Sequence, residues 1–557
     1  MISLSLYNGH NAAICIIKDG EILLNWELER YSRIKHDYGF SNNFLKKSLK
    51  ICGLEFKDID CIITNRQNYN RTYDFWKMFL KRSFSQGELQ SFNRKPPWKV
   101  PFTDNSDCVE FKIDNKKAYA LNHHLCHVAS SYFSSPFDEA TIITQDGGGD
   151  AENFSIGYAK NNHIEKFETR VVENIASWWS GITLNNYRMK RIHRWDPGSG
   201  AGKIMALAAY GREDEKIKKL IKETMNLGPN TKYTDKYSSA FNYDEDLSDT
   251  STNRSKNVAA SLQSITEKEL EKIYNEIYKI YPSNNLCLAG GVALNCVANT
   301  RVKSKYKKIH VPPFPNDTGL AIGMGLYHWH QILNNPKKKE YFSPYLGPSY
   351  SKKECYEEIN KKNSSLKRIF GINKKLKYEE CTIEKVSEYL SKRNIICMFR
   401  GRSESGPRAL GNRSIMCVPD GKLGRDYLNF KIKNREWYRP YAPIILDKYV
   451  DNILEDYIEH SPYMTTSAYI KADWRKKLDA VNHVDNSTRP QILKYEHNPF
   501  LYELIESVYH KTGIPVLLNT SFNKQEPIVE TPKNALNTFE NFNINFLVLN
   551  DYIVSKN

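Results

Sequence analysis

The sequence predicts an α/β protein of two domains. In the first part of the chain, apolar β-rich segments are followed by glycine turns and then by helical patterns, as in "EATIITQDGGGD" and "NLCLAGGVALN". A run rich in proline, lysine and glycine at 334–351 separates this part from a second one with a similar alternation. The 557 residues also exceed the length at which one hydrophobic core usually divides. We therefore place the domains at 1–345 and 352–557.

The elements of the first domain follow in order along the chain. Residues 1–66 alternate apolar strands with turns, whereas residues 67–116 are polar, aromatic and basic, so we expect an insertion or a surface arm there. A compact α/β pattern begins at residue 117 with the strand "KAYALN" and the helix "HHLCHVASSYFSS". A long helix is expected around 256–280, where apolar residues recur at helical spacing. The second domain mixes helices with strands such as "IPVLLNTSF".

The composition indicates a globular chain whose cysteines are reduced thiols. Hydrophobic residues make up 40% of it, and no run of eighteen apolar residues could span a bilayer. The first thirty residues lack the basic and apolar blocks of a signal peptide. The eleven cysteines include no CxxC pair, which argues against a zinc ribbon, a thioredoxin-type site or a disulfide framework. We expect a cytoplasmic protein without membrane association.

The net charge of +16 has two explanations that the sequence leaves open. Lysine, asparagine, isoleucine and tyrosine are abundant, as in proteins encoded by AT-rich genomes, and such coding bias alone raises lysine. The other explanation is a polyanionic substrate or partner.

Three histidines in "LNHHLCHVASSYF" suggest a metal site. On a helix, His123 and His127 lie four residues apart on one face, so both rings can reach one ion. Asp146 ends the next predicted strand, and Asp317 lies at a turn before a helix, where helix capping is the ordinary role of an aspartate. Two histidines and two aspartates suit a borderline metal such as iron or zinc, but their spacing does not establish that they converge.

Glycine-rich turns follow two buried strands of the first domain. Around Gly147 and Gly148 the backbone can approach a phosphate or a hydrated metal closely. The turn that contains Gly290, Gly291 and Asn295 should open a helix whose first N–H groups face an anion. Either turn alone is more often an ordinary tight turn, but two in the same half favour a nucleotide cleft between two lobes.

The second domain concentrates arginine in "RGRSESGPRALGNRS", which contains Arg402 and Arg408. The segment "KIKNREWYRPYAP" adds four more cations: Lys431, Lys433, Arg435 and Arg439. These residues are mixed with glycine, proline and aromatics and do not form a helical face, so we favour an anion pocket over a solvated surface. The strand "PVLLNTSFN" ends in a polar tip that includes Ser521.

Ten motifs occur in an order that resembles the O-carbamoyltransferases of the nodulation-factor, cephamycin and tobramycin type. They include "NGHNAA", "RIKHDYG", "HHLCHVASSYF", "QDGGGD", "GKIMALAAYG", "AGGVALNCVAN", "PFPNDTGLAIG" and "GRSESGPRALGNRS". The resemblance runs nearly from end to end and is weakest at 67–116. It implies a two-lobed, actin-like N-terminal domain (ASKHA type, Kae1-like) and a C-terminal α+β domain similar to YrdC/Sua5.

The resemblance also implies a two-step reaction. ATP and carbamoyl phosphate would give carbamoyl-adenylate in the C-terminal domain, and the carbamoyl group would then move to an acceptor hydroxyl in the N-terminal domain. By motif, a divalent metal, typically Fe²⁺, would bind to His123, His127, Asp146 and Asp317, while Mg²⁺ would accompany ATP. A cation near the carbamoyl carbonyl would stabilise the negative charge that develops on its oxygen.

The resemblance assigns further residues by motif. His10 is the candidate base or substrate-positioning residue, and Lys35 is a candidate electrostatic partner. The nucleotide site would be lined by Gly147, Gly148, Lys203, Gly290, Gly291 and Asn295. Carbamoyl phosphate and the ATP phosphates would be held by Arg402, Arg408, Lys433, Arg439, Arg489 and Ser521. Asn11 stands where the family usually has an aspartate, and Ala201 where an acidic residue is common.

The acceptor is less well defined than the reaction. The stretch "YRMKRIHRW" interleaves basic and aromatic residues that suit nucleic acid, although a solvated surface would look the same: Arg188, Lys190, Arg191, Arg194 and Trp195. We slightly favour a hydroxymethylpyrimidine of DNA, such as 5-hydroxymethylcytosine, presented flipped out or single-stranded to a phage-encoded enzyme in the host cytoplasm.

Three alternatives accompany this acceptor. The first is the same chemistry on a sugar or a small natural product. The second is tRNA threonylcarbamoylation, against which the motifs "GPRALGNRS" and "NREWYRP" argue. The third is a non-enzymatic, actin-like nucleotide switch, which leaves the arginine-rich second domain unexplained. The sequence does not define the oligomeric state.

Overall fold

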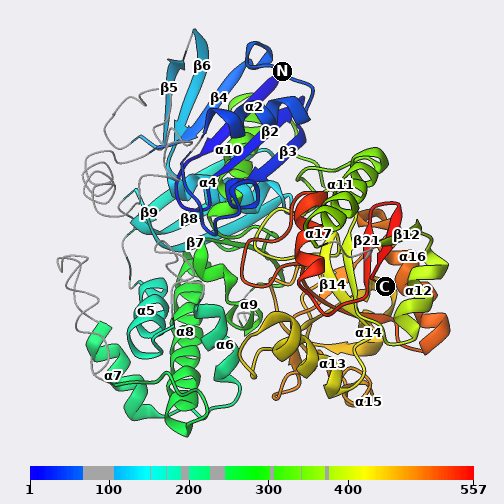
Figure 1. The fold of residues 1–557 in the computed structure, drawn as a ribbon. Helices are drawn as coiled ribbons and strands as arrows, with labels where there is room; N and C mark the ends of the chain where they lie inside the picture. Colours follow the sequence, from blue (N-terminus) through cyan, green and yellow to red (C-terminus); the bar gives the residue numbers. More distant parts are fainter. Residues whose placement is uncertain are drawn as a thin grey trace. The chain divides into compact units, whose positions relative to one another are not determined.

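The structure is a computed structural model of the 557-residue chain (Figure 1). It describes residues 1–39, 41–66, 106–113, 115–150, 152–170, 172, 174–189, 200–225, 245–301, 306–339, 342–370 and 376–556. The chain divides into two compact units, Met1–Phe342 and Ser343–Asn557. Each unit combines helices with mixed β-sheets, which confirms the expected α/β class.

The first sheet of the N-terminal unit has the strand order β3-β2-β1-β4-β6-β5. Its first three strands form an antiparallel meander, and β4 and β6 then add in parallel to β1. The strands are β1 (Ile2–Tyr7), β2 (Ala13–Lys18), β3 (Glu21–Glu27), β4 (Cys61–Asn65), β5 (Cys108–Ile113) and β6 (Lys116–Leu121). The end of the expected insertion at 67–116 is therefore an edge strand, β5, paired with β6, whereas residues 67–105 lie outside the described residues.

The second sheet of this unit has the order β11-β10-β7-β8-β9. Here β7, β8 and β9 form the antiparallel meander. Strand β10 then pairs in parallel with β7, and β11 pairs in parallel with β10. The strands are β7 (Glu139–Gly149), β8 (Glu152–Lys160), β9 (His163–Arg170), β10 (Asn285–Ala289) and β11 (Lys308–His310). The orders β3-β2-β1-β4-β6 and β9-β8-β7-β10-β11 match strand for strand, so the unit repeats one topology in two halves.

Two short helices pack closely between these sheets, α4 (His123–Phe133) and α10 (Leu320–Tyr327). Every residue of α4 is buried. A Cβ atom on Gly323 of α10 would lie only 2.0 Å from the carbonyl oxygen of Cys126, so a glycine is needed for the two backbones to approach. This packing brings the chain before α10 next to the first turn of α4.

Several of the remaining helices of the unit border the long helix α8 (Asn253–Ile280), which spans the stretch where the sequence predicted one (Figure 1). Helices α6, α7 and α9 contact α8. The bounds are α1 (Leu28–Ser32), α2 (Asn42–Ile51), α5 (Ile175–Gly181), α6 (Ala201–Ala208), α7 (Glu215–Met225) and α9 (Cys296–Arg301).

The C-terminal unit is built on an eight-stranded sheet with the order β12-β22-β21-β13-β14-β20-β15-β19. Its central strands are apolar and buried, as expected where helices cover both faces. The strands are β12 (Lys377–Glu380), β13 (Ile396–Phe399), β14 (Arg413–Cys417), β15 (Ala442–Leu446), β19 (Gln491–Leu493), β20 (Val516–Ser521), β21 (Phe546–Leu549) and β22 (Tyr552–Ser555).

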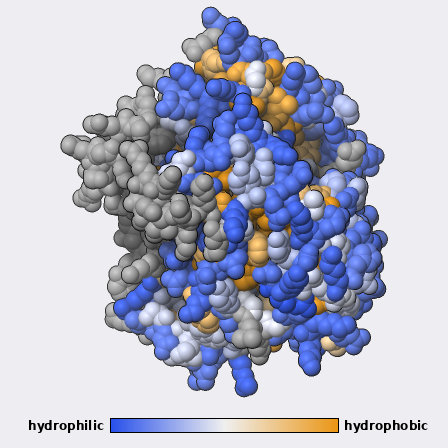
Figure 2. All heavy atoms as spheres, turned by 45° about the vertical axis from the view of Figure 1, so that its right-hand side comes forward, coloured by the Kyte–Doolittle hydropathy of each residue, from blue (hydrophilic) through white to orange (hydrophobic). Residues whose placement is uncertain are grey.

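A small three-stranded sheet and further helices complete the described part of this unit. The small sheet consists of β16 (Leu454–Glu455), β17 (Ala468–Ile470) and β18 (Ser487–Thr488). The helices are α11 (Lys352–Phe370), α12 (Ile383–Ser391), α13 (Lys422–Tyr427), α14 (Val450–Ile453), α15 (Ala472–Arg475), α16 (Pro499–Thr512) and α17 (Pro532–Glu540). Figure 2 shows that hydrophilic residues cover most of the face in view. No helix in the described part of the chain is both long and apolar enough to cross a membrane.

Candidate metal centre and anion-binding residues

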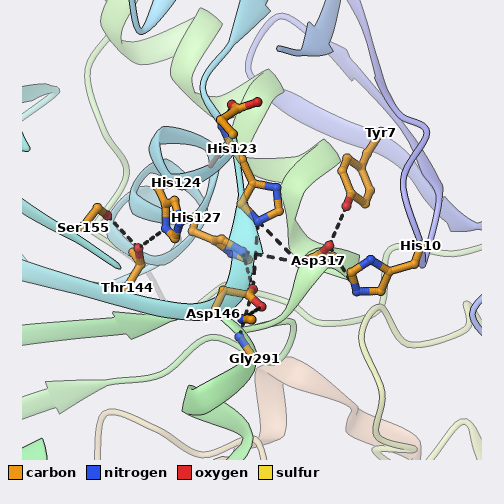
Figure 3. Close-up of polar contacts among 12 residues, drawn as sticks. Tyr7, His10, His123, His124, His127, Thr144, Asp146, Ser155, Gly291 and Asp317 are labelled. Atoms are coloured by element: carbon orange, nitrogen blue, oxygen red, sulfur yellow. Dashed lines mark hydrogen bonds and ion pairs between the residues drawn. The ribbon is translucent and has the colours of Figure 1, made fainter. Parts of the chain in front are cut away.

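Three elements of the N-terminal unit meet at a buried cluster of two histidines and two aspartates (Figure 3). His123 and His127 lie on the first two turns of α4, where the Asn122 side chain caps the helix by accepting from the backbone N–H of His124 and Leu125. Asp146 lies near the end of β7, and Asp317 begins the short 3-10 helix η5 (Asp317–Gly319) that leads into α10.

The distances within this cluster suit a small divalent cation. Nε2 of His127 lies 3.1 Å from Oδ2 of Asp146 and 3.4 Å from Oδ1 of Asp317. Nε2 of His123 lies 3.7 Å from Oδ1 of Asp317 and 4.0 Å from Oδ2 of Asp146. Ligand atoms about 2.1 Å from a tetrahedrally bound ion are separated by roughly 3.4 Å, which falls within the observed range. Nε2 of His123 is also buried and has no hydrogen-bond partner among the described residues.

The electrostatics of the cluster favour positive charge between the two carboxylates. Burial disfavours the charged imidazole of His123, but Asp317 and Asp146 outweigh it and raise the pKa of His123 to about 9. Burial likewise disfavours ionised Asp146, yet the neighbouring imidazoles of His123 and His127 hold its pKa well below the usual range. Two buried carboxylates therefore stay ionised and attract a cation, either a proton on His123 or a metal ion.

Backbone N–H groups orient Asp146. Its Oδ1 accepts from the N–H of Gly147 at 2.5 Å, and its Oδ2 accepts from the N–H of Gly291 at 3.1 Å. Gly290 has φ +88°, and a Cβ atom there would lie 2.2 Å from the carbonyl oxygen of Gln145. The "AGGVALN" turn, expected to face a nucleotide anion, thus directs its Gly291 N–H to the Asp146 carboxylate.

His10 approaches the cluster from the turn between β1 and β2. Its Nε2 lies 3.4 Å from Oδ2 of Asp317, and its side chain is 37% exposed, so it joins the buried cluster to solvent. The turn is held by the segment 33–39: the N–H of Ala12 donates to the carbonyl of Asp37, and Asn11 Oδ1 lies 2.7 Å from Nδ1 of His36. Lys35 lies in this segment with a half-buried side chain.

The other expected nucleotide residues are distributed over the second half of the same unit. Lys203 lies in the first turn of α6, which packs on α8. The Asn295 side chain accepts from the N–H of Ala298 at the start of α9 and donates to Oε1 of Gln263 on α8. Its amide therefore caps a helix in this structure. Gly148 has φ +151° at the end of β7.

In the C-terminal unit, two expected phosphate ligands bond to the protein itself. Nζ of buried Lys433 donates to the carbonyl oxygens of Ser521 at 2.5 Å and Asn523 at 2.6 Å. Arg402 donates to the carbonyl oxygens of Gly347 and Leu346. Both cations thus hold local backbone, and their role toward phosphate stays a prediction.

The other members of the expected anion pocket lie in loops or at a strand end. Nη1 of Arg439 lies 3.4 Å from Oε2 of Glu436. Arg408 and Arg489 are half-buried loop residues, and Ser521 ends β20 with its hydroxyl donating to Oδ1 of Asn523.

Only Arg188 of the expected nucleic-acid contacts lies in the described part of the chain. Its side chain is exposed and Nη1 lies 3.1 Å from Oδ2 of Asp246. Lys190, Arg191, Arg194 and Trp195 lie outside the described residues.

Sequence reasoning missed two residues that the structure adds to the centre. The hydroxyl of Tyr7 donates to Asp317, and Nδ1 of His124 lies 2.9 Å from Oγ1 of Thr144 behind the cluster. Burial and the charges of His123 and His127 lower the pKa of His124 to about 3, so this ring is neutral. His124, the second histidine of "HHLCH", thus supports the centre from the protein interior. No local spacing signals the role of Tyr7.

Comparison with known proteins identifies the class of protein to which this fold and cluster belong. Residues 2–326 match the family model described as Carbamoyltransferase N-terminus, and residues 387–556 match Carbamoyltransferase C-terminus. The chain belongs to the carbamoyltransferase family, and its relatedness to nodulation-type members supports an enzyme that transfers a carbamoyl group.

The relatives cover nearly the whole chain. An uncharacterized protein of Synechocystis is 31% identical over 98% of this chain and 95% of its own length. Nodulation protein NolNO of Sinorhizobium fredii is 27% identical over 98% and 79%, and nodulation protein U of Rhizobium tropici is 27% identical over 92% and 89%. Among solved structures, HypF of T. kodakarensis is 13% identical with a TM-score of 0.36 and covers 61% of this chain and 49% of its own. A likeness with so low a TM-score supports no conclusion about this chain.

Proposed function

We propose that this protein is an ATP-dependent O-carbamoyltransferase whose transfer centre is the buried cluster of His123, His127, Asp146 and Asp317. The convergence of these four side chains in a chain of the carbamoyltransferase family is the observation that carries the proposal. Two nitrogen and two oxygen donors suit Fe²⁺ among the divalent metals, and zinc as the alternative. When bound, the ion would polarise the carbamoyl carbonyl as a Lewis acid.

The protein's own groups would handle the acceptor hydroxyl. A hydroxyl is a poor nucleophile until a base removes its proton. His10 is partly exposed to solvent, and its Nε2 lies 3.4 Å from Oδ2 of Asp317, so we assign it as the base that takes the hydroxyl proton. Lys35, in the segment that holds the His10 turn, is the proposed electrostatic partner. The acceptor oxygen would bond to the carbamoyl carbon while the bond from that carbon to the adenylate oxygen breaks.

We assign the two steps to the two units of the chain. The repeated strand order in Met1–Phe342 supports a two-lobed, actin-like domain at 1–345 that binds nucleotide. The C-terminal unit is proposed as a YrdC-like domain at 352–557 that forms carbamoyl-adenylate from Mg²⁺–ATP and carbamoyl phosphate. The basic residues Arg408, Arg439 and Arg489 are its proposed phosphate contacts.

The acceptor remains a choice between two classes. A hydroxymethylpyrimidine in DNA would account for the net charge of +16. A sugar or small natural product is the alternative, in which case the charge reflects coding bias. The experiment below distinguishes the two.

The proposal is tested by incubating the full chain with ATP, carbamoyl phosphate and Fe²⁺ under anaerobic conditions. DNA containing 5-hydroxymethylcytosine, sugars and aminoglycosides are offered in parallel, and products are read by mass spectrometry. Transfer to a hydroxyl adds about 43 Da, the difference between a carbamoyl group and hydrogen. A gain on the DNA nucleoside identifies DNA as the acceptor, and a gain only on a sugar identifies the alternative.

Two controls make the result specific. Asp146→Asn should abolish transfer while leaving carbamoyl-phosphate-dependent pyrophosphate release intact, because that release belongs to the other unit. Asp138→Asn, which alters an exposed partner of Lys339, should change neither. Absence of carbamoyl-phosphate-dependent pyrophosphate release from the unaltered chain would contradict the proposed function.

A further inference from the structure

Asp150, the second acidic residue of "QDGGGD", has no role in the metal centre as described above. It lies at the turn between β7 and β8 and has a left-handed backbone at φ +51°, which is uncommon for a residue other than glycine. Its side chain is only 2% exposed. A glycine or an asparagine would suit the same backbone, so the turn itself does not account for a buried carboxylate at this position.

The Asp150 carboxylate is bonded to the first residue of α4. Its Oδ2 accepts from the backbone N–H of His123 at 2.8 Å. The next two N–H groups of the helix, those of His124 and Leu125, are already capped by the Asn122 side chain. A carboxylate is favourable at this end of a helix because it faces the positive end of the helix dipole. Asp150 therefore fixes the backbone of one proposed metal ligand in addition to the ordinary cap.

The same turn also supports the ring of His123. A Cβ atom on Gly149 would lie 2.2 Å from Cγ of that ring, so the ring rests against backbone that leaves no room for a side chain. Asp146, at the start of the turn, has its Oδ2 4.0 Å from Nε2 of His123. One short segment, 146–150, thus supplies one proposed ligand and holds a second ligand by its backbone and its ring.

Arg66 holds Asp150 from the other sheet of the N-terminal unit. Its Nε lies 3.8 Å from Oδ2 of Asp150, and its side chain is 14% exposed. Arg66 directly follows β4, and its backbone N–H donates to the carbonyl oxygen of Leu121 on β6 at 2.5 Å. Its Nη1 donates to the carbonyl oxygen of Ser106 at 2.8 Å. The guanidinium is therefore anchored to the first sheet, and through Asp150 it connects that sheet to the start of α4.

We propose that Asp150 is a positioning residue which, held by Arg66, sets the place of His123 in the metal centre. The four clustered ligand atoms do not include an oxygen of Asp150, so it acts through His123. Hydrogen-bonding partners that orient metal ligands typically change metal affinity about 10- to 100-fold. The inference rests on the metal site of the proposed function, but it does not depend on the acceptor, on ATP or on carbamoyl transfer.

The test measures Co²⁺ binding by the full chain without ATP, carbamoyl phosphate or acceptor. The unaltered chain is compared with Asp150→Asn, Asp150→Gly, Arg66→Gln and the control Asp19→Gly. Glycine adopts the left-handed conformation without strain, so Asp150→Gly removes the carboxylate and leaves the turn intact. Asp19 is also left-handed, at φ +49°, in the turn between β2 and β3, but its side chain is 62% exposed.

Both Asp150 variants should bind Co²⁺ about tenfold or more weakly, and the visible absorption bands of the bound ion should shift, because the placement of His123 changes. Arg66→Gln should weaken binding in the same direction. Adding it to Asp150→Asn should weaken binding no further, because Arg66 acts through Asp150. Asp19→Gly should match the unaltered chain in affinity and spectrum.

The absorption bands separate positioning from a general loss of stability, since destabilisation alone lowers the melting temperature and leaves the spectrum of the folded protein unchanged. A folded Asp150→Gly protein with the affinity and spectrum of the unaltered chain would overturn the inference. If that variant does not fold, Asp150→Asn answers the same question with a side chain of nearly the same size. Weakened Co²⁺ binding in the Asp150 variants would support the inference even if no carbamoyl transfer is ever observed. Carbamoyl transfer by the unaltered chain, with normal Co²⁺ binding in these variants, would keep the proposed function and reject the role of Asp150.

Discussion

The buried hydroxyl of Tyr7 donates a 2.5 Å hydrogen bond to Oδ2 of Asp317, the same oxygen that lies 3.4 Å from Nε2 of His10. The other oxygen, Oδ1, faces His123 and His127. Figure 3 shows Tyr7 and His10 approaching this carboxylate from one side and the two α4 histidines from the other. Asp317 therefore connects the proposed metal ligands to the proposed base, and Tyr7 fixes its orientation. Burial and the Asp317 charge keep the pKa of Tyr7 well above its usual range, so the phenol remains a donor.

Tyr7→Phe should weaken metal binding while preserving the fold. Phenylalanine fills nearly the same volume in β1 but removes the donor to Asp317. Loss of a hydrogen bond that orients a metal ligand typically lowers metal affinity about 10- to 100-fold. Calorimetric titration with Fe²⁺ under anaerobic conditions, or the visible spectrum of bound Co²⁺, would measure the effect. Tyr119→Phe, which removes a hydroxyl bonded to Glu110, is the control and should bind metal normally. Equal metal affinities in the unaltered chain and both variants would show that the Tyr7 hydroxyl does not contribute to metal binding.

Removal of the metal should lower the stability of the unaltered chain but not of Asp146→Asn. A ligand that binds only the folded state at about 100 times its dissociation constant contributes about 2.7 kcal/mol. Melting curves with and without a chelator, together with metal analysis of the purified protein, would measure this. The expected metal content is one ion per chain in the unaltered protein and near zero in the variant. A chelator effect of the same size in Asp146→Asn would place the metal elsewhere.

Gly290→Ala should destabilise the N-terminal unit more than a glycine replacement of similar backbone conformation in open space. Gly290 has φ +88° and no room for a Cβ beside Gln145, whereas Gly513 has φ +71° with no atom within 4 Å of its Cβ position. Gly513→Ala therefore reports the left-handed strain alone, about 1–2 kcal/mol. Gly290→Ala adds a backbone collision and should cost clearly more. Denaturant unfolding of both variants would compare the costs, and equal costs would contradict the close packing of this turn against β7.

The stability of the chain should fall on acidification between about pH 6.5 and pH 4 because of His328. Burial, helped by the charge of Lys117, lowers the pKa of His328 to about 4, whereas an unfolded histidine titrates near 6.5. Below pH 6.5 the unfolded chain binds a proton that the folded chain does not, so up to about 3 kcal/mol is lost as the pH falls to 4. Denaturant unfolding at pH 7, 5 and 4 would measure the loss.

His328→Asn should flatten this acid dependence because it removes the titrating group. Oγ of Ser3 lies 3.0 Å from Nδ1 of His328, and an asparagine amide can keep a hydrogen bond there. An unchanged pH slope in the variant would assign the acid sensitivity to other buried groups.

Several features of this protein are local and could be predicted from the sequence. The repeat of four residues between His123 and His127 fixes both rings on one face of α4, because a helix returns to the same side after about 3.6 residues. Strand runs such as Glu139–Gly149 and Asn285–Ala289 also follow from apolar pattern and glycine turns. Ten motifs in family order predicted the carbamoyltransferase family, to which the chain belongs.

The tertiary structure decided which polar groups become partners. Asp317 meets the α4 histidines because α10 packs on α4, a contact between segments about 200 residues apart that no local pattern encodes. Asp146 reaches them from β7, which also packs on α4. The cations of "KIKNREWYRP" look alike in sequence, yet Lys433 is bonded to carbonyl oxygens while Nη2 of Arg435 has no acceptor among the described residues. Charge is a property of the residue, but burial and the supply of oxygen atoms depend on distant strands and loops. For that reason the sequence by itself identified the candidate residues, and only the folded chain showed which of the cations hold local backbone.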